Sequence, residues 1–109
     1  MDDRGAEGSA ARAALVARGW TPTDDGRAVT RTFVFVDFAA CFAFMTAVAA
    51  AAEELAHHPD WSQAYGTLTV RLTTHDAGGL TARDVALADA ITARWAACQD
   101  VTNPTTSLT

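Results

Sequence analysis

Residues 38–56 constrain the fold more than any other part of this chain, because they form one long apolar stretch with marked ends. Alanine, the best helix former, is the most frequent residue in it. Asp37 is suited to cap the start of a helix, and Pro59 disfavours the α conformation at the residue before it. The stretch therefore predicts a long buried helix that ends near His57. Its apolar stripe would comprise Phe38, Cys41, Phe42, Met45, Val48, Ala49, Ala52 and Leu55.

Segments rich in β-branched and aromatic residues lie on both sides of this predicted helix. Residues 27–36 follow the turn signals of residues 22–26 and are predicted to form the second strand of a hairpin. Residues 61–74 are too long for one strand in a small domain, so we expect a break or bulge at Gly66. Beyond it, apolar residues alternate with polar ones, which is typical of a sheet with one buried face. These apolar residues are Leu68, Val70 and Leu72.

Two further helices complete the pattern. One is expected over 9–18, with Ser9 as its N-cap, and the other over about 82–98, preceded by a capping-box-like sequence. The order helix, two strands, helix, two strands, helix predicts an α+β fold, a four-stranded antiparallel sheet with three helices packed on one face. We expect a single domain over 9–98, a flexible N-terminus over 1–8 and a disordered tail over 99–109.

Length and charge narrow the classes of partner. A chain of 109 residues with a net charge of -5 and no run of Lys or Arg is not expected to bind nucleic acid directly, or an acidic membrane surface. Its longest uncharged apolar run, 38–52, is shorter than the ~20 residues of a membrane-spanning helix. The first residues are polar and acidic, unlike a secretory signal, so a cytoplasmic protein is expected. The small core favours an oligomer.

Three histidines lie within nineteen residues, from His57 to His75. Histidine side chains both donate and accept protons near neutral pH. Glu53 and His57 are four residues apart on the predicted helix, so we expect their side chains to interact. His58 would leave the helix and point elsewhere, and His75 follows a predicted strand. Three interpretations stay open: a surface pair without a role, a zinc site and an acid–base site.

Other kinds of chemistry find less support. Directly adjacent histidines rarely aim at one ion, which disfavours zinc, and the sequence contains no nucleophile elbow, phosphate-binding loop or dinucleotide fingerprint. Cys41 and Cys98 fall in predicted helices, where buried free thiols and a disulfide are the alternatives. Catalysis would then rest on proton transfer, as in a dehydration, hydration or isomerisation.

The residues around the histidines resemble the signature of a known family, the pterin-4a-carbinolamine dehydratases. The matching segments are 53–61, which reads Glu-Glu-Leu-Ala-His-His-Pro-Asp-Trp, then 73–75 with its Thr-Thr-His, and 79–84. Similar residues outside these segments extend the resemblance from about Leu15 to Ile91.

The resemblance implies a lyase that removes water from 4a-hydroxytetrahydropterin to give quinonoid dihydropterin, which recycles the cofactor of aromatic amino acid hydroxylases. The pterin is then the substrate, and no metal or other cofactor is implied. The family is further expected to share the predicted α+β fold and to form homodimers or homotetramers. The alternative is a binding module on the same fold, either a transcriptional coactivator or an assembly chaperone.

Carried over residue by residue, the resemblance implies a catalytic role for His57, His58 and His75. Contacts with the substrate are expected from two short segments. These comprise His57, His58, Pro59, Thr74, His75, Asp76 and Ala77. Supporting roles are expected for Glu53, Trp61 and Asp84, although capping also explains Asp84 and core packing equally explains Trp61.

Overall fold

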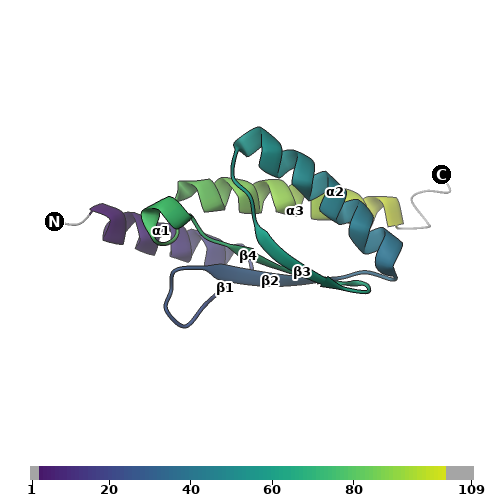
Figure 1. The fold of residues 1–109 in the computed structure, drawn as a ribbon, viewed down its shortest axis with the longest axis horizontal. Coiled ribbons are helices and arrows are strands. Elements are labelled where there is room, and N and C mark those ends of the chain that lie inside the picture. Colours follow the sequence, from purple (N-terminus) through teal and green to yellow (C-terminus); the bar gives the residue numbers. More distant parts are fainter. Residues whose placement is uncertain (1–2, 103–109) are drawn as a thin grey trace.

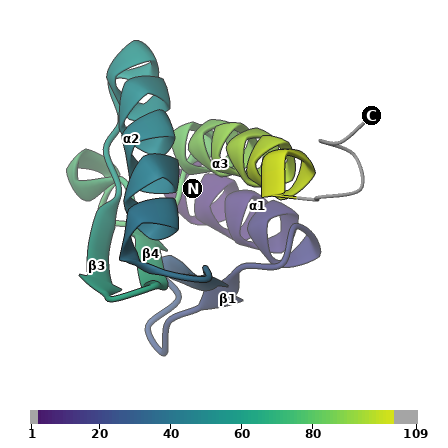
Figure 2. The ribbon, with the colours of Figure 1, turned by 90° about the vertical axis from the view of Figure 1, so that its right-hand side faces the viewer.

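The structure, a computed structural model, describes residues 3–102. Three α-helices lie on one face of a four-stranded antiparallel sheet, and α3 contacts both α1 and α2 (Figures 1 and 2). The predicted α+β fold is therefore confirmed. The elements are α1 (Asp3–Ala17), β1 (Thr21–Pro22), β2 (Val29–Val34), α2 (Phe38–Leu55), β3 (Asp60–Ala64), β4 (Thr67–Leu72), the 3-10 helix η1 (His75–Ala77) and α3 (Ala82–Thr102).

The sheet has the strand order β1-β2-β4-β3, so that β4 lies between β2 and the edge strand β3. The predicted break in residues 61–74 is a tight turn at Tyr65 and Gly66, which makes β3 and β4 a hairpin. Gly66 accepts a hydrogen bond of 2.7 Å from the Phe35 amide. A Cβ at this glycine would lie 2.6 Å from the Phe35 carbonyl oxygen, so the close approach of the two backbones requires glycine here.

The core lies between the sheet and the helices. As predicted, Leu68, Val70 and Leu72 of β4 are fully buried, and they face apolar residues of α3 such as Leu87 and Ile91 within one cluster. This packing fixes the position of α3 on the sheet. The first turn of α3 therefore lies beside the histidines.

The predicted buried face of α2 is partly wrong. The helix buries Cys41, Phe44, Val48, Ala51 and Ala52, whereas four members of the predicted stripe are exposed. These are Phe38, Phe42, Ala49 and Leu55. Apolar residues occur all around this helix, so the sequence pattern does not select one face, and packing against α3 and the sheet decides it.

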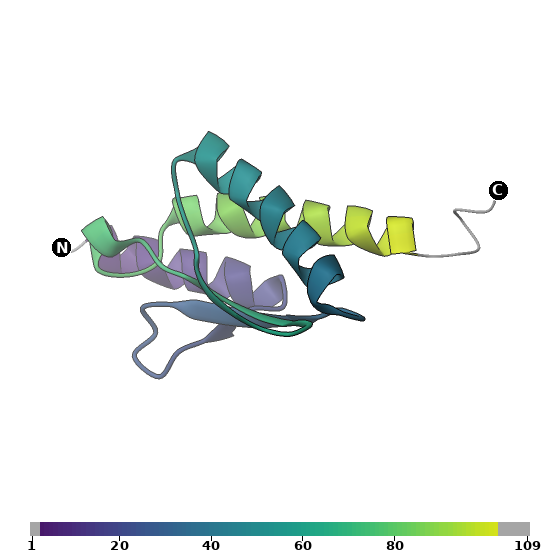
Figure 3. The same cartoon turned by 45° about the vertical axis from the view of Figure 1, so that its right-hand side comes forward.

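By length and composition, α2 is the one helix within residues 3–102 that could cross a membrane, and 28% of it is buried inside the structure. Figure 3 shows it crossing α3 at an angle, with one side turned away from the other elements.

Both terminal helices are longer than predicted. The first begins at Asp3 rather than at Ser9, and the helix as a whole packs on α3. The last continues past Cys98 to Thr102. The remainder of the predicted tail, 103–109, lies outside the described residues.

Candidate active site

The end of α2 determines where the histidine pair lies. The helix stops at Leu55, and Ala56 adopts a left-handed conformation with φ 51° and ψ 40°. The His57 amide donates to the Ala52 carbonyl at 3.1 Å and the Ala56 amide to the Glu53 carbonyl at 3.2 Å, the two hydrogen bonds of a Schellman motif. The chain therefore turns before the first histidine rather than after it.

This turn overturns one predicted contact. Glu53 and His57 do not interact along one helix face, because the left-handed residue between them redirects the chain. Glu53 instead contacts His58, with 2.6 Å between Oε2 and Nε2, and both side chains are exposed. His57 points inward, and only 7% of its surface is accessible to solvent.

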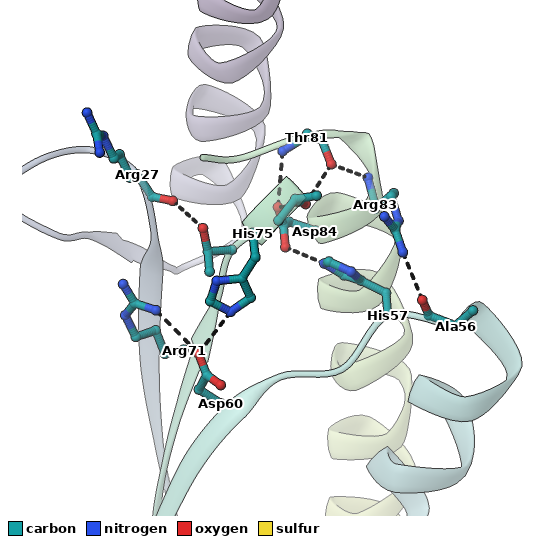
Figure 4. A network of polar contacts seen from close by, with 11 residues as sticks. Arg27, Ala56, His57, Asp60, Arg71, His75, Thr81, Arg83 and Asp84 are labelled. Carbon is teal, nitrogen blue, oxygen red and sulfur yellow. Dashed lines mark hydrogen bonds and ion pairs between the residues drawn. The ribbon is translucent and has the colours of Figure 1, made fainter. Parts of the chain in front are cut away.

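The partner of His57 is Asp84 in the first turn of α3. Its Oδ1 lies 2.6 Å from His57 Nε2, and the carboxyl group is fully buried. The other oxygen, Oδ2, accepts hydrogen bonds from the Thr74 hydroxyl at 2.7 Å and from the Thr81 amide at 3.0 Å. The capping box is therefore present, as predicted, but the same carboxylate also binds a histidine (Figure 4).

His75 begins η1, shortly after the end of β4 at Leu72, and also faces a carboxylate. Its Nε2 is 3.9 Å from Oδ2 of Asp60, the first residue of β3. Arg71 of β4 donates to that same oxygen at 3.3 Å (Figure 4). Each of the three histidines thus has its own carboxylate: one buried at 2.6 Å, one exposed at 2.6 Å and one exposed at 3.9 Å.

The three histidines line one hollow of about 210 Å³ between the end of α2, the end of β4 and the start of α3. Of the predicted substrate contacts, Pro59 and Ala77 do not line it. Trp61 packs against the core and does not line it either. A larger hollow of about 350 Å³ beside α1 contains none of the histidines. The site hollow is lined by Ala56, His57, His58, Thr73, Thr74, His75, Asp76 and Arg83.

Three lining residues were not predicted from the sequence, Ala56, Thr73 and Arg83. Arg83 donates from its guanidinium to the Ala56 carbonyl at 2.8 Å and so ties the start of α3 to the end of α2. Thr73 donates to the Arg27 carbonyl at 2.7 Å, which joins the end of β4 to the loop before β2. Both bonds join segments far apart in sequence, and no local pattern signals them.

The carboxylates determine which ring nitrogen of each histidine is free. An ionised carboxylate only accepts hydrogen bonds, so the nitrogen that faces it must carry the hydrogen. In His57 and His58 that nitrogen is Nε2. The Nδ1 atom of each neutral ring is then left as a proton acceptor, and in the protonated ring as a proton donor. The arrangement therefore supplies more than one group able to exchange a proton within a single hollow.

Within residues 3–102, no group of three His, Cys, Asp or Glu side chains is placed to hold a metal ion. Cys41 and Cys98 are free thiols, the first buried and the second half-buried. Burial raises the pKa of the Cys41 thiol, which makes it a poor nucleophile.

Comparison with known proteins agrees with this fold. The sequence model of the pterin 4 alpha carbinolamine dehydratase family matches residues 5–94. A protein of Afipia carboxidovorans that carries the provisional name pterin-4-alpha-carbinolamine dehydratase is 59% identical over 80 residues, which cover 72% of this chain and 80% of that protein. The chain belongs to the pterin 4 alpha carbinolamine dehydratase family.

Solved structures also resemble this one. A crystal structure from Brucella melitensis, described as a transcriptional coactivator/pterin dehydratase, aligns with a TM-score of 0.71 and 42% identity over 75% of this chain and 88% of that chain. A pterin dehydratase-like protein identified as a RuBisCO assembly factor in the alpha-carboxysome has a TM-score of 0.60 and 24% identity, over 69% and 87%. The latter shows the shared fold alone.

Proposed function

We propose that this protein dehydrates 4a-hydroxytetrahydropterin to quinonoid dihydropterin and so recycles the pterin cofactor of aromatic amino acid hydroxylases. The observation that carries the proposal is the convergence of His57, His58 and His75 on one hollow, each with its own carboxylate. Membership of the family supports the same reaction.

The reaction requires one proton donor and one proton acceptor. The hydroxyl on C4a takes up a proton and leaves as water, while the proton on N5 is removed and its bonding pair forms the new C4a=N5 double bond. The histidine nearest the hydroxyl donates, and the histidine nearest N5 accepts. Positioned acid–base groups of this kind contribute about 10² to 10⁴ in rate. The pterin is the substrate, and the proposed proton transfers need no further cofactor.

The proposal is tested by mixing the purified protein with freshly generated 4a-hydroxytetrahydropterin and following the absorbance of the quinonoid product. We expect formation of product at least about 10² times faster than the spontaneous reaction at saturating substrate. A rate equal to the spontaneous one, with folded protein in excess over substrate, would refute the function.

We further propose that the chain forms a homodimer or homotetramer through the outer side of α2. Phe38 and Phe42 stack there with ring centroids 6.1 Å apart and planes at 8°, and about half of each side chain is exposed. A second copy would bury this pair, and an exposed aromatic pair of this kind is typical of an interface.

Replacement of Phe42 by serine is expected to shift the protein toward monomers, because it removes half of the stacked pair. Sedimentation velocity over a dilution series measures the change. Val16→Ser on α1, where the side chain is similarly exposed at 49%, is the matched control and should leave the assembly unchanged. Identical association of both variants would contradict an interface at α2.

The alternative proposal, a binding module, draws on the descriptions of the two structural neighbours. A surface that only binds another protein does not require three histidines paired with carboxylates, so the site favours the enzyme. His58→Ala separates the two functions, because it should lower turnover by at least about 10²-fold and leave the binding of a protein partner intact.

A further inference from the structure

Asp60 is the carboxylate beside His75 and, unlike Glu53 and Asp84, has no role predicted from the sequence. It follows the His57-His58-Pro59 sequence directly and begins β3. In the β3–β4 hairpin it lies opposite Arg71, and the two side chains form an ion pair of 3.3 Å. The backbone register therefore fixes the position of this carboxylate relative to β4, and His75 lies just beyond the end of that strand.

One oxygen of Asp60 faces two groups. Oδ2 lies 3.3 Å from a guanidinium nitrogen of Arg71 and 3.9 Å from Nε2 of His75 (Figure 4). Asp60 itself lines neither the site hollow nor the adjoining hollow of about 240 Å³ that shares Thr73 and His75 with it. The Asp60 carboxylate thus contacts His75 from outside both hollows, where it would not contact a ligand bound in either of them.

We propose that Asp60 is a positioning residue that directs Nε2–H of His75 toward the sheet and leaves Nδ1 as its exchanging nitrogen. The inference rests on the proposed dehydratase function. At 3.9 Å the contact exceeds hydrogen-bond length, so the carboxylate acts on the exposed ring through its charge, directly or through one water molecule. Arg71 holds the carboxylate in place.

The other charged groups around the His75 ring do not take the place of Asp60 as its partner. Asp76 is the next residue in η1, and Arg83 lines the opposite wall of the site hollow. Asp25 and Arg27 line the adjoining hollow from the loop before β2. Asp25 is already engaged by the Thr23 hydroxyl at 2.8 Å and the Arg27 amide at 3.0 Å. Asp60 is therefore the carboxylate that the described structure pairs with His75.

The test uses Asp60→Asn, which keeps the shape of the side chain and removes its charge. We expect kcat for dehydration to fall about fivefold, the upper end of the effect of an exposed charge pair. KM should stay unchanged, because Asp60 lines neither hollow. The imidazole nitrogen chemical shifts of His75 should move toward the other tautomer. With three histidines in the chain, its signals are assignable by single substitutions.

Two further variants separate positioning from stability. Asp60→Glu restores a carboxylate and should recover kcat to within about twofold. Asp89→Asn breaks another exposed ion pair, that with Arg18 at 2.7 Å, and should change neither kcat nor the His75 signals. Unchanged nitrogen shifts in Asp60→Asn, or a loss confined to KM, would overturn the inference. An inactive native protein would instead refute the proposed function, and the nitrogen shifts would still decide the role of Asp60.

Discussion

His58→Ala is expected to lower kcat for dehydration by about 10²- to 10⁴-fold, the contribution of one positioned acid or base. The free energy of unfolding should change by less than about 0.5 kcal/mol. The reason is that both His58 and its partner Glu53 are exposed, with 61% and 77% of their side chains accessible to solvent. Stopped-flow assays and urea unfolding measure the two quantities on the same preparation.

His57 requires a different substitution, because its imidazole supports a buried carboxylate. His57→Ala would leave Asp84 without its closest partner and is expected to cost about 3 kcal/mol of stability. His57→Gln is the better test, since its side-chain amide can still donate a hydrogen bond to Asp84 but cannot exchange protons. We expect it to lose at least about 10² in kcat with a free energy of unfolding within about 1 kcal/mol of the native value.

Together, His57→Gln and His58→Ala test whether proton exchange by the two histidines is required for activity. A folded His57→Gln protein and a folded His58→Ala protein that both turn over substrate at the native rate would show that proton exchange by the pair is not required. Loss of activity in step with loss of stability would show a structural role instead. The expected result is that activity and stability separate.

The strand β4 could be predicted because it alternates clearly between apolar and polar residues. In β4, Leu68, Val70 and Leu72 are specified as one buried face by the period of two alone. The sequence of α2 does not specify which face is buried, since apolar residues occur on all sides of the helix. Its existence followed from alanine content, but its buried face depends on tertiary packing with α3.

The site, too, was predicted in part from the sequence and in part depends on tertiary packing. That three histidines belong together followed from the resemblance, whereas their partners did not follow from spacing. The predicted pairing of Glu53 with His57 failed because Ala56 adopts a conformation that is uncommon for any residue but glycine. The contact of His57 with Asp84 spans 27 positions of the chain and depends on how α3 crosses the sheet. Capping explained Asp84 from local sequence and so concealed its second role.

Asp84→Asn is expected to inactivate the enzyme while keeping the fold, because of a constraint that the backbone imposes. The Thr81 amide donates to Oδ2 of Asp84 and can only donate. Asparagine must therefore place its carbonyl oxygen at the Oδ2 position, and its NH2 group then occupies the Oδ1 position that faces Nε2 of His57. That NH2 group donates, so Nε2 must accept, and the ring hydrogen moves to Nδ1.

The expected outcome is a fall in kcat of at least about 10²-fold, because Nδ1 can no longer accept a proton. All hydrogen bonds around the buried position persist in this arrangement, and the free energy of unfolding should fall by only about 1 kcal/mol for the lost charge. Asp84→Ala, by contrast, leaves the donors of His57 and Thr81 facing a void and should cost about 3–5 kcal/mol. Imidazole nitrogen shifts report the tautomer of His57 directly.

Glu53→Gln is the matched control, because the same chemical change there imposes no tautomer. The side chain of Glu53 is exposed, so the amide of glutamine can rotate to present either its oxygen or its NH2 group to His58. We expect at most about a fivefold loss of kcat from this variant. Full activity in Asp84→Asn, together with a shifted tautomer of His57, would mean that Nδ1 of this histidine takes no part in proton exchange. Loss of activity only in Asp84→Asn would identify the buried pair as the group that keeps this nitrogen free for the reaction.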